Sequence, residues 1–321
     1  MTSEEVIENI RTGRIHGSTE VVFYALDQML EVLRRERRPD RFAQFALLVV
    51  KARPTSALLM NAVREVSKLV LDSQGEPIDA IVEKVSKKVE ELKSRIRNAI
   101  EEASSIAEKR IESGDTILTA SYSVFVRKSV EKALRRGKDI KVIVTESRPG
   151  GEGVRLASEL AGLGCDVTLI VDSAVRFVMK NVDKVLLGSE SVTANGANVN
   201  KVGSSQMALA AHEARVRVFV VTSILKFSPE TLVGEIVEIP EADTQEIKSQ
   251  LEQKGIKGVK VRAPLFDVTP PEYIDAIITE KGLVAPSFVI MTVRDLYGWP
   301  PKLVPLEGML HKLSMVEGYD G

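Results

Sequence analysis

Residues 115–145, DTILTASYSVFVRKSVEKALRRGKDIKVIVT, open a series of strand, turn and helix that continues to residue 222. In this series, stretches with helical spacing separate short β-branched apolar runs, which lie at 117–118, 142–144, 167–171, 185–187 and 218–221. Strands that alternate with helices form a parallel sheet that helices cover on both faces. The sequence therefore predicts a doubly wound α/β fold for this part of the chain.

The residues before this series lack strand signals and show helical spacing, with breaks at 37–40 and 73–77. We therefore expect a helical N-terminal domain over residues 1–113 and a sheet domain over residues 114–321. In the last N-terminal helix, at 78–106, apolar residues follow one another in alternating steps of four and three. We favour one long helix that lies on its own domain, and a coiled-coil partner is the alternative.

The chain beyond residue 222 is less regular. Residues 238–260 are charged and strand-poor, which predicts a surface connection. Residues 264–271, PLFDVTPP, predict a rigid loop, and alternating apolar character resumes at 273–279.

The composition excludes several classes of protein. The 44 Lys and Arg residues nearly balance 45 Asp and Glu residues, so we expect no direct nucleic acid partner and no membrane partner. A single cysteine, Cys165, excludes an intrachain disulfide and fits a packing residue better than a reactive thiol. The N-terminus lacks the basic and apolar regions of a signal peptide, and no apolar run reaches membrane-spanning length. We expect a cytoplasmic protein.

Polar residues follow the strands of the sheet. Ser121 comes after the first strand, Arg148 after the second, Asp172 after the third, Glu190 after the fourth and Lys226 after the fifth. In open α/β sheets, ligands bind beyond the carboxyl ends of the strands. These side chains therefore predict a ligand site at that edge, of the kind that holds a phosphorylated sugar.

Two arginines are candidates for phosphate binding. Arg148 precedes a glycine-rich turn at 150–153 and a helix that begins near Val154, where exposed backbone N–H groups and a guanidinium suit a phosphate. Arg53 precedes residues 55–56, which can cap a helix and direct its amino end at an anion. The alternatives are a turn that only reverses the chain and an ordinary surface arginine.

Asn200 and Lys201 lie in a polar loop at 195–201, ahead of a helix that begins near Gly203. Individually they resemble ordinary surface residues. Their location near the strand ends, which Lys226 shares, makes them candidates for ligand binding.

The acid–base candidates are Glu190 and Asp172, whose carboxylates can move a proton at a sugar carbon or hydroxyl, or can instead orient a backbone amide. Ser121 has no evident activating base, because the chain holds only three scattered histidines. Those histidines and one cysteine fit no common metal-ligand spacing, so we expect no metal and no cofactor.

A series of motifs carries a resemblance over nearly the whole chain. The motifs are RPT at 53–55, TESRP at 145–149, VDSA at 171–174, GSE at 188–190, NG at 195–196, NKVG at 200–203, KF at 226–227 and FDVTPP at 266–271. In this order they resemble the family that groups the alpha, beta and delta subunits of translation initiation factor 2B with archaeal ribose-1,5-bisphosphate isomerase and methylthioribose-1-phosphate isomerase. The resemblance implies a helical N-terminal domain, a Rossmann-like C-terminal domain, and a homodimer or hexamer built from dimers.

The length and the segments 138–146 and 267–278 are similar to the archaeal isomerases, but the catalytic positions differ. Where those isomerases carry a catalytic cysteine in a Thr-His-Cys-His-Ser run, this chain has Ser121, and a serine hydroxyl does not readily ionise. Where they carry a catalytic aspartate in a Gly-Ala-Asp run, it has Glu190, whose extra methylene shifts the carboxyl group by about an ångström. Their N-terminal Arg-Gly-Ala run is altered at residues 16–18.

These departures lead to our main interpretation, a regulatory protein like the initiation factor 2B subunits that binds a sugar phosphate or nucleotide without isomerase activity. Its binding residues would be Arg53, Arg148, Asp172, Asn200, Lys201 and Lys226. The alternative is an aldose–ketose isomerase acting on ribose 1,5-bisphosphate, with Glu190 in the acid–base role and Ser121 assisting. A third possibility is a structural protein that contacts initiation factor 2.

Overall fold

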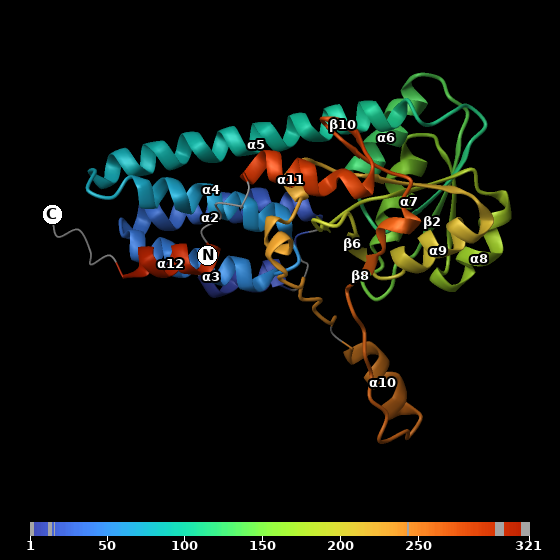
Figure 1. Ribbon diagram of the computed structural model, residues 1–321. Helices are drawn as coiled ribbons and strands as arrows, with labels where there is room; N and C mark the ends of the chain where they lie inside the picture. Colours follow the sequence, from blue (N-terminus) through green and yellow to red (C-terminus); the bar gives the residue numbers. More distant parts are fainter. Residues whose placement is uncertain (1–2, 12–14, 16, 243, 299–304, 316–321) are drawn as a thin grey trace.

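The computed structural model describes residues 3–11, 15, 17–242, 244–298 and 305–315, so that His16 lies outside the described residues (Figure 1). The helices are α1 (Ser3–Arg11), α2 (Ser18–Glu36), α3 (Pro39–Ala52), α4 (Ala57–Asp72), α5 (Ile78–Glu108), α6 (Val124–Arg135), α7 (Glu152–Gly162), α8 (Val175–Val178), α9 (Ser204–Ala214), α10 (Gln245–Gln253), α11 (Val289–Tyr297) and α12 (Leu306–Ser314). The strands are β1 (Thr116–Ala120), β2 (Lys141–Thr145), β3 (Asp166–Ile170), β4 (Lys184–Leu187), β5 (Ser191–Val192), β6 (Asn198–Lys201), β7 (Arg217–Val221), β8 (Phe266–Thr269), β9 (Ala276–Thr279) and β10 (Gly282–Val284).

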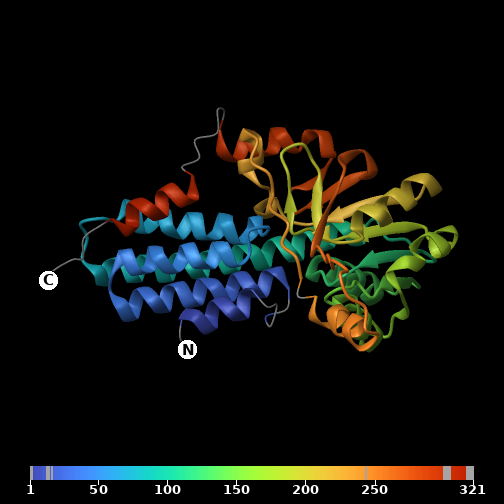
Figure 2. The ribbon, with the colours of Figure 1, turned by 90° about the horizontal axis from the view of Figure 1, so that it is seen from below.

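The first five helices form a bundle beside the sheet, as Figures 1 and 2 show, and this bundle is called the helical layer below. The long helix α5 runs along this layer and extends beyond it as far as α6. Its apolar stripe packs on α2, α4 and α6. Val85 and Val89 in this stripe are fully buried. The prediction of one long helix is confirmed, and neighbouring helices cover its stripe. The helix does not lie on the predicted N-terminal domain alone, because α6 belongs to the predicted sheet domain.

Seven strands form the main sheet in the order β10-β9-β7-β4-β1-β2-β3. The pairs are parallel except for β10 with β9, which confirms the α/β fold class. Successive strand residues point to opposite faces. Ile117 therefore joins the core under α5 and α6, whereas Leu118 joins the core under α8, α9 and α11. The five expected strands are β1, β2, β3, β4 and β7.

A second, smaller sheet was missed by the sequence analysis, which expected loops at 195–201 and 264–271. β5, β6 and β8 pair in this order, and β6 and β8 run antiparallel, with Asn200 opposite Asp267 and Lys201 opposite Phe266. These strands lack an alternating apolar pattern, and a partner distant in the sequence stabilises each of them. The loop expectation is therefore wrong for both segments.

The C-terminal part also departs from the expected order. α12 packs on α3 and α4 of the helical layer rather than on the sheet (Figure 2), because Leu306, Met309, Leu310 and Leu313 bury one face of it. The division of the chain at residues 113 and 114 stays a prediction.

The charged segment at 238–260 contains α10 and projects away from the rest of the molecule (Figure 1).

Two further observations concern membrane-spanning helices and the single thiol. Within the described ranges, no helix has both the length and the apolar character needed to span a bilayer. Cys165 is free and buried, and burial raises the pKa of its thiol to about 11, as expected of a packing residue.

The turn between β2 and α7 depends on a glycine. A Cβ atom at Gly153 would lie 1.7 Å from the carbonyl oxygen of Thr145, so only glycine lets the amino end of α7 approach the sheet this closely. We expect Gly153→Ala to lower the free energy of unfolding by at least about 2 kcal/mol, because a backbone carbonyl cannot move aside. Chemical denaturation measures this loss.

Gly162 in the same helix is the matched control, since nothing lies within 4 Å of its position for a Cβ. Gly162→Ala should change the stability by less than about 1 kcal/mol, in the stabilising direction. Equal effects of the two substitutions would contradict the packing argument.

Candidate functional site

Arg53 and Glu190 form a bidentate ion pair between the helical layer and the sheet. Arg53 follows the last residue of α3, and Glu190 follows the carboxyl end of β4. The Arg53 Nε lies 2.7 Å from Oε1 of Glu190, and an Nη lies 3.1 Å from Oε2. The carboxylate side chain is only 5% exposed. Two parallel charge-assisted hydrogen bonds fix its position and orientation.

The same pair fixes the protonation state of Glu190. Burial alone would raise the pKa of this carboxyl group, but the positive charges of Arg53 and Lys226 outweigh burial and hold the pKa below its usual value. Glu190 is therefore an ionised carboxylate at neutral pH.

Lys226 is a second cation near Glu190, and it comes from the sheet side of the ion pair. It ends the short helix η3 (Ile224–Lys226) after β7, and its Nζ donates hydrogen bonds to the Ser189 carbonyl at 2.6 Å and to the Ser18 hydroxyl at 2.9 Å. The Nζ also lies 5.2 Å from the centre of the Phe125 ring. Burial lowers the pKa of Lys226 to about 8, against the opposing attraction of Glu190. Such an ammonium group can both hold an anion and exchange a proton near neutral pH.

The turn that carries Lys226 is held from helix α4. Nδ2 of Asn61 donates to the carbonyl oxygens of Leu225 and Phe227, both at 3.0 Å, so that one amide binds the backbone on either side of Lys226. Arg64 donates to Oδ1 of Asn61 at 2.7 Å. Asn61 is therefore a positioning residue for Lys226.

The ends of β1, β2 and β3 meet in a second group of residues. Ser121 and Ser147 both have positive φ values, 61° and 63°, and the Ser147 hydroxyl accepts the backbone N–H of Ser121 at 2.7 Å. Asp172 accepts the backbone N–H groups of Ser147 and Arg148, both at 2.8 Å. Asp172 thus orients backbone amides, which is the alternative role that the sequence left open. Arg148, three residues beyond β2, is exposed.

Asn200 and Lys201 lie on β6, where both are buried. The Asn200 amide donates to the Ser204 hydroxyl at 2.9 Å. The Lys201 Nζ forms an ion pair with Oε1 of Glu152, the first residue of α7, at 2.6 Å. The predicted ligand residue Lys201 therefore already has an anionic partner.

Gly188 leaves room for neighbouring side chains beside the segment that leads to Glu190. A Cβ atom at this position would lie 2.7 Å from the Ser123 hydroxyl and 3.9 Å from Oδ1 of Asn200, so the segment that leads to Glu190 lies close to both side chains. Of the predicted residues, the structure joins Arg53 and Glu190 directly, and Lys226 binds the carbonyl oxygen of Ser189, the residue before Glu190. It gathers Ser121, Arg148 and Asp172 at the ends of neighbouring strands.

The sequence analysis missed four residues that contact this site: Ser18, Asn61, Ser147 and Glu152. Ser147 lies within the TESRP motif and Glu152 lies shortly after it, so the motif could have indicated both residues as members of the site. Asn61 and Ser18 belong to helices of the N-terminal layer, and only tertiary packing brings them to the strand ends.

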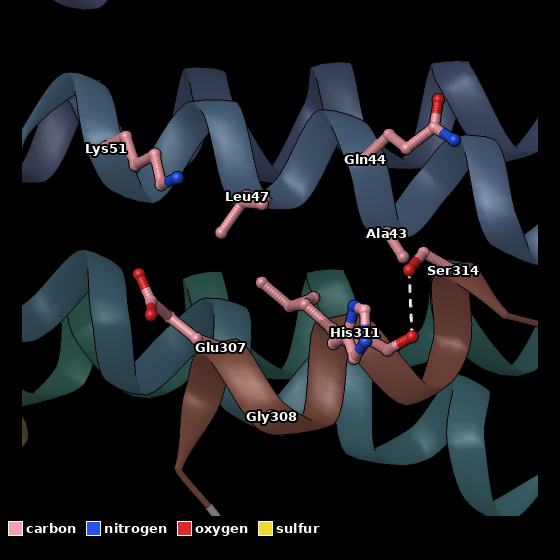
Figure 3. A pocket seen from close by; sticks show the side chains of 9 residues that line it. Ala43, Gln44, Leu47, Lys51, Glu307, Gly308, His311 and Ser314 are labelled. Carbon is pink, nitrogen blue, oxygen red and sulfur yellow. Dashed lines mark hydrogen bonds between the residues drawn. The ribbon is translucent and has the colours of Figure 1, made fainter.

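A separate cavity of about 380 Å³ lies between α3 and α12 (Figure 3). Lys51 of α3 and Glu307 of α12 stand on its opposite sides, and none of the predicted site residues lines it. The candidate site is therefore the group of residues at the strand ends and not this cavity.

Asn61→Ala removes both hydrogen bonds to the turn that carries Lys226. We expect the pKa of Lys226 to rise from about 8 toward its usual value, because a looser turn lets water reach the ammonium group. NMR titration of protein labelled with ¹³C at the lysine ε position measures this pKa. The signal of Lys226 is identified as the one that is missing from the spectrum of the Lys226→Met variant. Ser67→Ala changes another buried polar residue of α4 and should leave the pKa of Lys226 unchanged. An unchanged pKa of Lys226 in Asn61→Ala would contradict the positioning role of Asn61.

Comparisons with known proteins show which named proteins this chain resembles. The chain is 48% identical over 189 residues to ribose 1,5-bisphosphate isomerase of Methanocaldococcus jannaschii, an alignment that covers 59% of this chain and 61% of that protein. It is 47% identical over 188 residues to the Pyrococcus furiosus isomerase of the same name, covering 58% of each chain. The chain thus spans about three fifths of the length of these curated relatives. A crystal structure of the Pyrococcus horikoshii translation initiation factor eIF-2B superimposes with a TM-score of 0.78 at 30% identity, covering 90% of this chain and 98% of that one.

These comparisons overturn our main functional interpretation, a regulatory protein without isomerase activity. Six curated relatives at 37–48% identity carry the name ribose 1,5-bisphosphate isomerase. The physical reason for the error is that Ser121 and Glu190 were judged as isolated groups. The structure instead gives Glu190 an orienting arginine and places it near a lysine whose pKa is about 8.

The model of the initiation factor 2 subunit family matches residues 14–286. This match extends from the helical layer to the end of the sheet, which confirms the resemblance that the sequence motifs carry. The chain belongs to the initiation factor 2 subunit family.

Proposed function

We propose that this chain is an aldose–ketose isomerase that acts on ribose 1,5-bisphosphate or a related sugar 1-phosphate. The observation that carries the proposal is the 48% identity over 189 residues to an isomerase of that name. The site supports it, because an ionised carboxylate and a lysine of lowered pKa stand together at the carboxyl ends of the strands.

The reaction moves two hydrogens and opens the sugar ring. The hydrogen on C2 of the aldose ends on C1, the proton of the C2 hydroxyl ends on the ring oxygen, and the bond between C1 and that oxygen breaks. C2 becomes the ketone carbon, and the phosphate groups stay in place. The atoms balance without an oxidant or reductant, so the protein must supply groups that accept and return protons.

Glu190 is the group that accepts and returns a proton. Its ion pair with Arg53 fixes both oxygens but also makes it a weak base, so the proton that it takes must be acidified by a neighbouring charge. The Lys226 ammonium supplies this charge by stabilising negative charge on the adjacent substrate oxygen. Ser121 assists as a hydrogen-bond donor, since its hydroxyl does not ionise near neutral pH.

The remaining predicted residues hold the anionic groups of the substrate. Arg148 and Lys201 face phosphate oxygens, and Asn200 holds a hydroxyl. Asp172 acts through the backbone, since both of its carboxylate oxygens already accept N–H groups of the turn that carries Arg148.

The proposal includes a cytoplasmic homo-oligomer built from dimers. The edge strand β3 and the segment after it expose three large apolar side chains, Leu169, Val171 and Phe177, which could pack against a second copy of the chain. Contact with initiation factor 2 stays a prediction.

The test of the proposal is turnover. The purified protein should convert ribose 1,5-bisphosphate to ribulose 1,5-bisphosphate, detected by chromatography or NMR, and Glu190→Gln should lower kcat by about a hundredfold or more while the KM changes little. A neutral amide keeps the shape of the side chain but cannot take a proton.

Glu159→Gln is the matched control, because it removes a carboxylate whose ion-pair partners are Arg127 and Arg155 and not residues of the candidate site. It should retain turnover. Absence of product in the wild type would refute the proposed function, and full activity in Glu190→Gln would refute the role of Glu190 in it.

A further inference from the structure

Lys201 is a buried cation with an internal anion beside it. Its side chain is 7% exposed, and the Glu152 carboxylate lies 2.6 Å from its Nζ. A buried ammonium group needs such a partner, since an unpaired charge in the interior is costly. Any substrate phosphate that binds Lys201 must therefore compete with Glu152.

The backbone forces Glu152 into this place. Gly153 presses the amino end of α7 against the end of β2, and a Cβ atom at Gly150 would lie 2.5 Å from Oε1 of Glu152. The carboxylate therefore folds back over the glycine-rich turn. The amino end of a helix favours negative charge, and Glu152 is the first residue of α7, beside the glycine-rich turn where the sequence predicts a phosphate.

The charges of the site cancel without substrate. Among the described residues, the cations Arg53, Lys201 and Lys226 stand against the carboxylates Glu152 and Glu190, and Glu20 adds a further negative charge that acts on Arg53 and Lys226. A sugar bisphosphate brings up to four more negative charges. The site can accept them more readily if one carboxylate leaves.

Glu152 is the carboxylate that can leave. Its side chain is 31% exposed, against 5% for Glu190, so it has a route to solvent. Its second oxygen, Oε2, is buried and makes no hydrogen bond with any described residue, so turning outward gains hydration for that atom.

We propose that the Glu152 carboxylate occupies the place of a substrate phosphate beside Lys201 and turns out to solvent when the phosphate binds. This inference rests on the proposed function only in taking a phosphorylated sugar as the ligand. An internal carboxylate of this kind sets the specificity of the site, because a monoanionic or neutral ligand competes with it less well than a phosphate dianion.

The test is a substitution that should improve binding. Glu152→Gln removes the competing charge with little change in shape, so the affinity for inorganic phosphate and for ribose 1,5-bisphosphate should rise on the order of tenfold, measured by isothermal titration calorimetry at low salt. Glu159→Gln removes the same charge from the same helix away from Lys201 and should change the affinity by less than about twofold.

A double-mutant cycle with Lys201→Met isolates the pair. In the Lys201→Met background, Glu152→Gln should give little gain, because the cation for which carboxylate and phosphate compete is gone. Unchanged or weaker binding in Glu152→Gln, or a full gain without Lys201, would overturn the inference. Binding of inorganic phosphate involves no turnover, so an inactive protein whose Glu152→Gln variant binds inorganic phosphate more tightly would refute the proposed function and keep this inference.

Discussion

The ion pair between Arg53 and Glu190 is the interaction on which the rest of the site depends. It joins the end of α3 to the end of β4, across 137 residues of sequence, and both partners are largely withdrawn from water. A buried pair contributes little net stability, but removing one partner leaves an unpaired buried charge and costs on the order of 3–5 kcal/mol. The pair therefore constrains the two layers to one arrangement, in which the helical layer closes the site over the strand ends.

The helical layer supplies more than a cover. Ser18 at the start of α2 accepts a hydrogen bond from Lys226, and Asn61 of α4 binds the backbone on either side of that lysine. Arg64 of α4 in turn forms an ion pair with Glu230 beyond the same turn. These contacts bury Lys226, and burial is the main cause of its lowered pKa. A property of a residue in the sheet domain thus depends on side chains from another part of the chain.

The sequence predicts the local features of this structure better than the tertiary ones. The strands of the main sheet and the long helix α5 follow from periodicity, because each is a continuous apolar pattern. The strand-end positions of Ser121, Arg148, Asp172, Glu190 and Lys226 follow from the geometry of parallel sheets. The pairing of β6 with β8, the return of α12 to the helical layer and the contact of Asn61 with the Lys226 turn depend on segments far apart in the sequence. No local pattern specifies such contacts.

The error about function has the same origin. A glutamate is one methylene longer than an aspartate, and that difference misplaces a carboxylate only where nothing fixes its position. Arg53 binds both oxygens of Glu190, so the longer side chain has a defined place, and its geometry is decided by a residue 137 positions away. A serine cannot take over the ionised state of a cysteine, but burial lowers the pKa of Lys226 to about 8, so Ser121 is not the one polar group near Glu190 to be considered among the described residues. The chemistry of a site belongs to the groups that its fold brings together, so two substitutions in a motif do not by themselves establish that the activity is lost.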